Sequence, residues 1–380
     1  MKKFIRGLVL LMVLGAAVGS AWQSWAWWSW ATAPARSPVP TEGKAAAEGG
    51  DALQIQIVRG TSARQIGRDL EALGVIRSSA AWDLWVRWLT LSGKAGGFQA
   101  GTYELSPSLA MPAIAERIWS GETIQQTFTI PEGWTIQQMG AYFEAQGFFR
   151  ADAFVAATRK IPRDRFPWLP EGLPHLEGFL FPDTYRLPAE TMTPDSAIAA
   201  MLTQFEQVAL PVWEANRTNT KLNLREWVTL ASIVEKESVI PQERTLIAGV
   251  FTNRLNRGQR LEADPTVEYG LKVTQTPDRP LSIAQVRTPS PYNTYLNAGL
   301  PPTAIAAPGK ASLEATLKPD TTDYLFFVAR YDGTHVFSKT LAEHEAAVQR
   351  IRAERRAAQQ APSPSPSSSP GPSPSPRPSP

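Results

Sequence analysis

Several chemistries are excluded by residues and motifs that the 380-residue sequence lacks. It has no cysteine, so disulfide bonds, thiolate metal sites and cysteine nucleophiles cannot occur. The histidines His175, His335 and His344 are scattered without H-x-x-x-H spacing, and no metal site is predicted. Walker A, G-x-G-x-x-G and G-x-S-x-G motifs are absent, so no cofactor is predicted. A net charge of only +3 gives no indication of a nucleic-acid partner.

An uncharged run, residues 7–31, determines the predicted compartment. At about 1.5 Å per residue it is long enough to span roughly 30 Å of hydrocarbon as a helix. Lys2, Lys3 and Arg6 precede it, which predicts that residues 1–6 are cytoplasmic, and tryptophans crowd its far end, as at a membrane interface. A transmembrane helix is therefore expected. A signal peptide cleaved near "GSA" is the alternative, and in both cases the rest of the chain is exported.

Composition separates a folded part from two flanking segments. Residues 32–50 are rich in proline, glycine and alanine and predict a linker. Residues 354–380 end in a proline- and serine-rich tail that cannot form a core and is expected to be disordered. The folded part between them mixes strand and helix patterns, so the predicted fold class is α+β.

A weak internal repeat lies in the first part of the folded region. Residues 58–76, "VRGTSARQIGRDLEALGVI", align with residues 131–149, "PEGWTIQQMGAYFEAQGFF". Each copy predicts a strand, a glycine turn, an N-cap (Ser62 or Thr135), an amphipathic helix and a glycine stop. Small units of this kind occur in modules that bind wall glycans, so residues 51–150 are predicted to be such a region. Two unrelated strand–helix units are the alternative.

Beyond residue 150 the pattern is mainly helical. Helix starts are predicted at Thr193 with Pro194, at Asn223 with Glu226 three residues later, and at Thr340. Alternating residues around Asp332-Gly333 predict a β-hairpin near the C-terminus. Residues 151–353 are therefore expected to form a larger, mainly helical domain that ends in a hairpin and a last helix.

Two glutamates near the end of the helix that begins at Leu224 are predicted to face opposite ways. Glu235 falls within the apolar stripe formed by Leu224, Val228 and Ala231, whereas Glu237 falls on the polar side. Glu235 is thus expected to face inward and Glu237 to face solvent. An inward carboxylate needs a partner or a task, and a salt bridge to an arginine is the simplest explanation.

Glu177 is a second carboxylate among apolar residues, within "HLEGFLFPDTYRL". Desolvation by neighbouring leucine and phenylalanine side chains would raise its pKa, as a general acid at near-neutral pH requires. An exposed glutamate at a turn is the alternative. Further polar groups suited to a sugar site stand in rigid loops after residue 258: Asp264, Tyr292 and Asn293.

Seven stretches together resemble one known family. They are, in order, "LEGFLFPDTY", "ASIVEKES", "VFTNRL", "ADPTVEYG", "SPYNTY", "GLPPTAIAAPG" and "YLFFVARYDGTHVFS". This order is similar to that of the YceG-like endolytic murein transglycosylases, the MltG family. The resemblance covers about residues 51–350 together with the N-terminal membrane segment.

The resemblance implies a single-pass protein of the inner membrane with a LysM-like region and a catalytic domain in the periplasm. It implies cleavage of the β-1,4 bond between N-acetylmuramic acid and N-acetylglucosamine in nascent peptidoglycan, which leaves 1,6-anhydro ends and limits strand elongation. Peptidoglycan synthases are possible partners. The family's catalytic glutamate corresponds to Glu177. The predicted substrate-binding residues are Glu235, Asn253, Asp264, Tyr292 and Asn293.

Two other functions stay open on the sequence alone. A hydrolytic muramidase would pair Glu177 with Glu235 or Asp264 and use water. A non-catalytic scaffold would bind peptidoglycan through the repeat and release no fragments.

Overall fold

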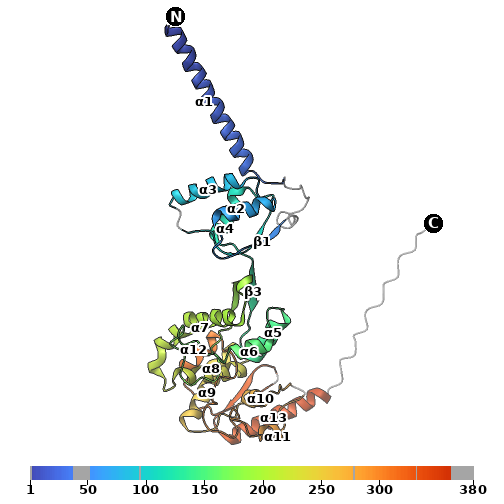
Figure 1. Cartoon of the computed structure of the whole chain (residues 1–380). Helices are drawn as coiled ribbons and strands as arrows, with labels where there is room; N and C mark the ends of the chain where they lie inside the picture. Colours follow the sequence, from blue (N-terminus) through green and yellow to red (C-terminus); the bar gives the residue numbers. More distant parts are fainter. Residues whose placement is uncertain (1, 37–51, 94–95, 277–278, 331, 361–380) are drawn as a thin grey trace, which may run out of the picture. The chain divides into compact units, whose positions relative to one another are not determined.

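The computed structural model describes residues 2–36, 52–93, 96–276, 279–330 and 332–360, with side chains from residue 11 to residue 357 (Figure 1). Its helices are α1 (Lys2–Thr32), α2 (Ala63–Ala72), α3 (Ser79–Leu91), α4 (Met111–Ser120), α5 (Ile136–Ala145), α6 (Ala151–Ala157), α7 (Pro194–Asn216), α8 (Leu224–Glu237), α9 (Arg244–Asn256), α10 (Asp264–Leu271), α11 (Ile283–Val286), α12 (Lys310–Leu317) and α13 (Leu341–Gln360). Its strands are β1 (Leu53–Ile57), β2 (Gly101–Leu105), β3 (Gln125–Thr129), β4 (Thr184–Pro188), β5 (Phe326–Ala329) and β6 (His335–Ser338). Short 3-10 segments lie at Ala189–Thr191, Arg217–Asn219 and Pro241–Glu243.

The strands pair, within the described residues, into three two-stranded antiparallel sheets: β1 with β2, β3 with β4, and β5 with β6. Helices and small sheets together confirm the α+β class, and the pairing of β5 with β6 confirms the predicted C-terminal hairpin. Searched over its described residues, the chain has no helix that is both long and apolar enough to cross a membrane.

The predicted helix starts are confirmed by their hydrogen bonds. Ser62 and Thr135 accept from the amides of Gln65 and Gln138, at the starts of α2 and α5. Thr193, Asn223 and Thr340 accept in the same way from the residue three positions on, at the starts of α7, α8 and α13. Each side chain satisfies an amide that the first helical turn would otherwise leave without a partner.

The flanking segments lie mostly outside the described residues. Of the predicted linker at residues 32–50, residues 37–50 are not described, and residues 361–380 of the predicted tail are not described either. The predicted start of the tail, residue 354, is wrong, because α13 continues to Gln360. Residues 353–360, "AERRAAQQ", are strong helix formers, and proline does not interrupt them before Pro362.

The chain divides into two compact units, residues 1–129 with 184–200, and residues 130–183 with 201–380. The domain boundary predicted near residue 150 falls inside the second unit, and the predicted division stays a prediction. Each unit has its own apolar core. In the first unit, Ile55 and Ile57 of β1 alternate with exposed glutamines, and Ile55 lies opposite the buried Tyr103 of β2.

The aligned glycines Gly67 and Gly140, one in each copy of the repeat, are both required by close packing against the next helix. A Cβ at Gly67 of α2 would lie 2.4 Å from the indole of Trp82 in α3. A Cβ at Gly140 of α5 would lie 3.1 Å from the carbonyl oxygen of Ala151 in α6. In each copy, therefore, a glycine at the same helical position lets the following helix approach closely.

The second unit is built around α8, α9 and α12, which pack on one another (Figure 1). Its core includes Leu230 and Ile233 of α8, Ile247 and Phe251 of α9, and Ile305. The indole N–H of Trp227 in α8 donates to the carbonyl of Leu313 in α12 at 3.0 Å. This arrangement confirms the helical character predicted beyond residue 150 and forms the platform for the site described next.

Candidate active site

Glu177 lies in the irregular segment between α6 and β4 and is buried, with 2% of its surface exposed. Leu176, Phe179 and Leu180 around it are buried as well, so the alternative of a solvated glutamate is wrong. The next residue, Gly178, has φ +86°, and a Cβ there would lie 2.4 Å from the Cβ of Ala304. Glycine is thus required both by the backbone conformation and by the close packing that holds Glu177 in place.

The Glu177 carboxylate accepts hydrogen bonds from two donors, a backbone amide and a tyrosine hydroxyl. The backbone N–H of Ile136, the first residue of α5, donates to Oε1 at 3.0 Å and to Oε2 at 3.3 Å. The phenol of Tyr269 in α10 donates to Oε2 at 3.0 Å. The amide of Ile136 is one that the first helical turn leaves free, so the carboxylate completes the start of α5.

Burial raises the pKa of Glu177 to about 8, against an ordinary value of 4.5. Removal from water dominates, because it penalises the charged form. The hydrogen bonds from Ile136 and Tyr269 favour the anion and offset part of the increase. At neutral pH the side chain therefore holds its proton and is a neutral acid, as predicted.

His175 supports the same segment from two residues upstream. The Glu177 amide donates to its Nδ1 at 3.3 Å, which leaves the ring proton on Nε2. Burial, followed by the positive charge of Arg159, lowers the pKa of His175. A neutral imidazole thus lies beside the acid.

A cavity of about 600 Å³ opens over Glu177, within the size range of sites that bind drug-sized ligands. It is bounded by the start of α5, by α6, by α10 and by the segment containing Tyr292. Among the described residues, the ionisable side chains that line it are Arg159, His175, Glu177, Lys236, Glu268 and Lys272. The cavity thus combines a buried acid with polar and cationic walls.

Tyr269 and Tyr292 form an aromatic pair on one wall, with ring centroids 4.8 Å apart. The Tyr292 hydroxyl lies 2.9 Å from Oγ1 of Thr303, which is buried. Tyr292, predicted as a sugar-binding residue, therefore lines the cavity and steadies the tyrosine that contacts Glu177.

The other four predicted substrate-binding residues do not line this cavity. Glu235 is partly buried, and its Oε2 accepts from the amide of Gly309, at the start of α12, at 3.0 Å. The predicted salt bridge to an arginine is thus replaced by a hydrogen bond to a backbone amide at the start of a helix. Asn253 donates to the carbonyls of Thr322 and Tyr324 at 2.7 and 3.1 Å and ties α9 to the segment before β5.

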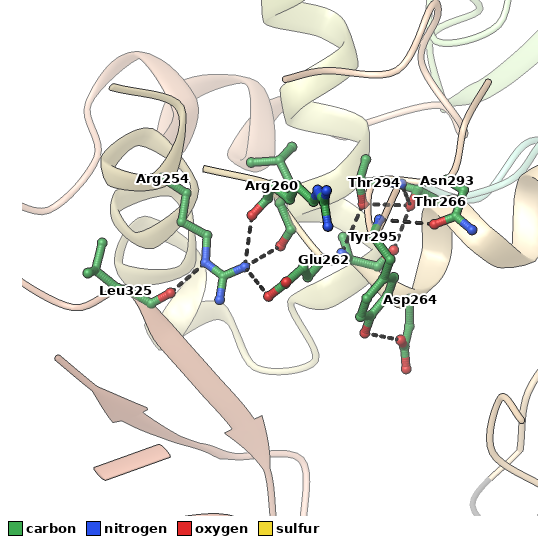
Figure 2. Close-up of polar contacts among 11 residues, drawn as sticks. Arg254, Arg260, Glu262, Asp264, Thr266, Asn293, Thr294, Tyr295 and Leu325 are labelled. Atoms are coloured by element: carbon green, nitrogen blue, oxygen red, sulfur yellow. Dashed lines mark hydrogen bonds and ion pairs between the residues drawn. The ribbon is translucent and has the colours of Figure 1, made fainter. Parts of the chain in front are cut away.

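Asp264 and Asn293 also contact protein groups. Asp264 Oδ1 accepts from the hydroxyl of Tyr295 at 2.7 Å (Figure 2). Asn293 is buried, donates to the carbonyls of Val286 and Thr288 at 2.8 Å, and accepts from the amide of Tyr295. Both side chains stabilise the loop that carries Tyr292.

Arg254 anchors the neighbouring loop from α9 (Figure 2). Its guanidinium donates to the carbonyls of Arg260, Leu261 and Leu325 and pairs with Glu262 at 2.9 Å. The "VFTNRL" motif, which contains Asn253 and Arg254, thus holds loops in place at the second unit's C-terminal hairpin.

Glu237 departs from its prediction. It is partly buried rather than solvated. Burial, followed by the negative charges of Asp264 and Glu268, raises the pKa of Glu237 to about 8. The polar side of α8 at this end packs against α10, which helical periodicity alone does not reveal.

Tyr269 and the Ile136 amide are site groups that sequence reasoning missed. Tyr269 stands in the quoted stretch "ADPTVEYG", where Asp264 was selected instead. Pro265, Glu268 and Tyr269 follow i, i+3, i+4 spacing, and this face of α10 lines the cavity. The spacing was a usable signal for Tyr269, but a backbone amide has no sequence signature.

A buried carboxylic acid that keeps its proton at neutral pH, at the base of a polar cavity, has the properties that general acid catalysis requires. Comparison with known proteins identifies the family. The chain belongs to the YceG-like family, whose model matches residues 55–350.

Similar proteins from two other bacteria carry the same name. The chain is 34% identical over 314 residues to the "Endolytic murein transglycosylase" of Bacillus subtilis, covering 78% of this chain and 84% of that protein. It is 29% identical to the protein of the same name from Streptococcus pneumoniae strain D39, with 78% of this chain and 58% of the relative covered. A solved YceG-like protein of Listeria monocytogenes is similar with a TM-score of 0.53 and 30% identity, over 78% of this chain and 99% of that chain.

Proposed function

We propose that this protein is an endolytic murein transglycosylase in which Glu177 is the catalytic acid and base. Its substrate is the β-1,4 bond between N-acetylmuramic acid and N-acetylglucosamine within nascent glycan strands. The observation that carries the proposal is the burial of Glu177 beneath the cavity, which keeps it protonated at neutral pH. Its products carry 1,6-anhydro ends, and such cleavage limits strand elongation.

A single carboxyl group suffices for this reaction. Glu177 donates its proton to the glycosidic oxygen as the bond from that oxygen to C1 of the muramyl residue breaks. The resulting carboxylate, held by Ile136 and Tyr269, then removes the proton from the muramyl C6 hydroxyl as its oxygen bonds to C1. The proton returns to Glu177, the acid is regenerated, and no water is consumed.

The cavity walls have roles in the same reaction. Tyr292 offers an aromatic surface to a sugar ring and supports Tyr269. Arg159, Lys236 and Lys272 bind polar groups of the strand. The other predicted substrate-binding residues affect substrate binding indirectly, because they hold the loops and helix starts around the cavity. They are Glu235, Asn253, Asp264 and Asn293.

Location and wall binding belong to the same proposal. Residues 7–31 anchor the chain in the inner membrane, a proposal supported by their lack of charge, their length and the basic residues that precede them. The catalytic unit then lies in the periplasm, where peptidoglycan synthases are potential partners. Residues 51–150 contribute LysM-like binding to glycan strands, supported by the repeated strand, capped helix and close helix contact.

The variant Glu177→Gln keeps the shape of the side chain and removes the transferable proton. We expect the rate of glycan cleavage to fall by at least about 100-fold, the scale of general acid catalysis. Release of fragments from purified glycan strands measures it. The exposed Glu171 gives the matched control, because Glu171→Gln makes the same chemical change outside the cavity and should cleave at the wild-type rate.

Mass spectrometry of the fragments separates the remaining functions. An anhydro end is one water lighter than the reducing end that a hydrolytic muramidase leaves. Fragments with reducing ends would contradict transglycosylation, and binding without release of fragments would identify a scaffold. A Glu177→Gln enzyme that cleaves at the normal rate would overturn the assignment of the acid.

A further inference from the structure

Helix α3 carries an exposed apolar stripe that no contact within the described residues covers. Leu84, Trp88 and Leu91 are 48%, 55% and 86% exposed, and the exposed Arg87 lies between them. The four positions follow i, i+3, i+4, i+7 spacing and share one side of the helix. The other side, with Trp82 and Leu89, is buried. Isolated exposed leucines need no explanation, but a continuous stripe marks an interaction site.

The stripe is continuous with the tryptophan-rich end of α1. The ring of Trp88 lies 4.7 Å from that of Trp85, which lies 6.3 Å from that of Trp28 in α1. Arg77 adds a second link, because its guanidinium donates to the carbonyl of Trp30 and stacks 5.8 Å from its ring. Four further tryptophan side chains at this end of α1 are exposed: Trp22, Trp25, Trp27 and Trp30.

We propose that α3 lies in the lipid–water interface of the membrane and docks the first unit onto the outer leaflet through Leu84, Arg87, Trp88 and Leu91. The inference rests on the proposed membrane anchoring by α1. Tryptophan is the residue most typical of membrane interfaces, because its ring is apolar and its N–H polar. Arg87 supplies a guanidinium for lipid phosphates, while its stem lies along the apolar stripe.

A phospholipid surface fits the stripe better than a second copy of the chain. The patch begins where an uncharged run of 25 residues ends, so an inserted α1 brings α3 to the interface without any further partner. A basic residue among exposed tryptophan and leucine is the composition of a helix that lies in the plane of an interface.

The absence of cysteine allows a direct test on the full-length chain. Single cysteines are introduced as Leu91→Cys in the stripe, Gln56→Cys on an exposed position of β1, and Leu14→Cys in α1. Each is labelled with an environment-sensitive fluorophore in nanodiscs of phosphatidylethanolamine and phosphatidylglycerol. Quenching by nitroxide-labelled lipid and by aqueous iodide is then compared.

The label at position 91 should be quenched by the lipid nitroxide and be several-fold less sensitive to iodide than the label at position 56. Equal behaviour at positions 91 and 56 overturns the docking surface. Protection from iodide without lipid quenching, as in a dimer, overturns it too. Position 14 reports the anchoring separately, so a label in lipid at 14 beside a solvated label at 91 refutes only the docking.

A second variant tests the stripe itself. Adding Leu84→Gln and Trp88→Gln to the Leu91→Cys chain removes two exposed apolar groups and leaves the buried side of α3 intact. The label at position 91 should then become accessible to iodide, while the thermal unfolding midpoint stays near that of the parent. A label that remains in lipid would overturn the role of the stripe.

Discussion

At the scale of single residues, the acidity of Glu177 results from competition between burial and two hydrogen-bond donors. Burial favours the neutral acid, whereas the Ile136 amide and the Tyr269 phenol favour the anion. The same two donors that moderate the pKa also hold both carboxylate oxygens in place. The proposed mechanism needs both forms, because Glu177 gives a proton in one step and takes one in the next.

The pH dependence of cleavage tests this balance. Since the acid form starts the reaction, kcat/KM should fall as pH rises through about 8. The variant Tyr269→Phe removes a donor that favours the anion, so the pKa of Glu177 rises and the descending limb shifts to higher pH. The matched control Tyr295→Phe loses a bond to Asp264 outside the cavity and should leave the limb in place. An unmoved limb in Tyr269→Phe would contradict the positioning role of this tyrosine.

The raised pKa of Glu177 should also make the free energy of unfolding depend on pH. The folded pKa of Glu177, about 8, lies above its ordinary value of 4.5, so the unfolded chain releases this proton first as pH rises. Ionisation of Glu177 therefore costs the wild type stability between these values, and Glu177→Gln lacks this contribution. Both proteins keep the contribution of Glu237, whose pKa is also raised to about 8, so it cancels in the difference between them. We expect the difference in unfolding free energy to widen in favour of the variant by roughly a few kcal/mol over this range.

Urea unfolding at a series of pH values measures that difference. The exposed Glu171→Gln variant should follow the wild type at every pH. A constant difference between Glu177→Gln and wild type across the range would mean that Glu177 ionises as an ordinary carboxyl group.

At the scale of elements, the candidate site depends on loops that are tied to helices. Arg254 and Asn253 of α9 bind backbone carbonyls of residues 260–261 and 322–325, and Asn293 binds those of the loop before Tyr292. Buried carbonyls need donors, and these side chains supply them. Asn253 and Asn293, which were predicted to bind sugars, thus form hydrogen bonds with the protein backbone.

The variant Asn253→Ala separates a structural role from a substrate-binding one. It removes the donors to the carbonyls of Thr322 and Tyr324, so we expect a loss of about 1–3 kcal/mol in the free energy of unfolding, with KM for glycan strands unchanged. Asn256→Ala, at an exposed position of the same helix, should change stability by less than about 0.5 kcal/mol. A raised KM with unchanged stability would instead support direct binding.

The sequence predicted where helices start, but it predicted only some of the directions in which side chains point. Asn223 and Thr340 cap their helices as predicted, because a cap depends on residues three positions apart. Glu237 was placed wrongly, because its surroundings come from α10, which lies far along the sequence. Tyr269 was missed for the same reason, since its partner Glu177 is 92 residues away.

At the scale of the whole molecule, the proposed membrane anchoring rests on one segment at the N-terminus. Deleting residues 2–32 removes α1 and the uncharged run, so we expect the protein to move from the membrane pellet to the supernatant after ultracentrifugation. Removing residues 361–380 serves as the control and should leave the protein in the pellet with unchanged cleavage activity. A truncated chain lacking residues 2–32 that still sediments with membranes would contradict anchoring by this segment alone.

The sequence by itself determined the helix caps and the C-terminal hairpin, because each depends on neighbours within a few residues, and its mixed strand and helix patterns indicated the α+β class. Glu177 was selected through the order of motifs that resembles the YceG-like family. Only the tertiary structure decided which groups surround that glutamate. The Ile136 amide, the Tyr269 phenol and the cavity come from segments far apart in the chain, and packing alone brings them together. The pKa of Glu177 follows from that assembly, since desolvation is a property of the folded surroundings and not of the residue.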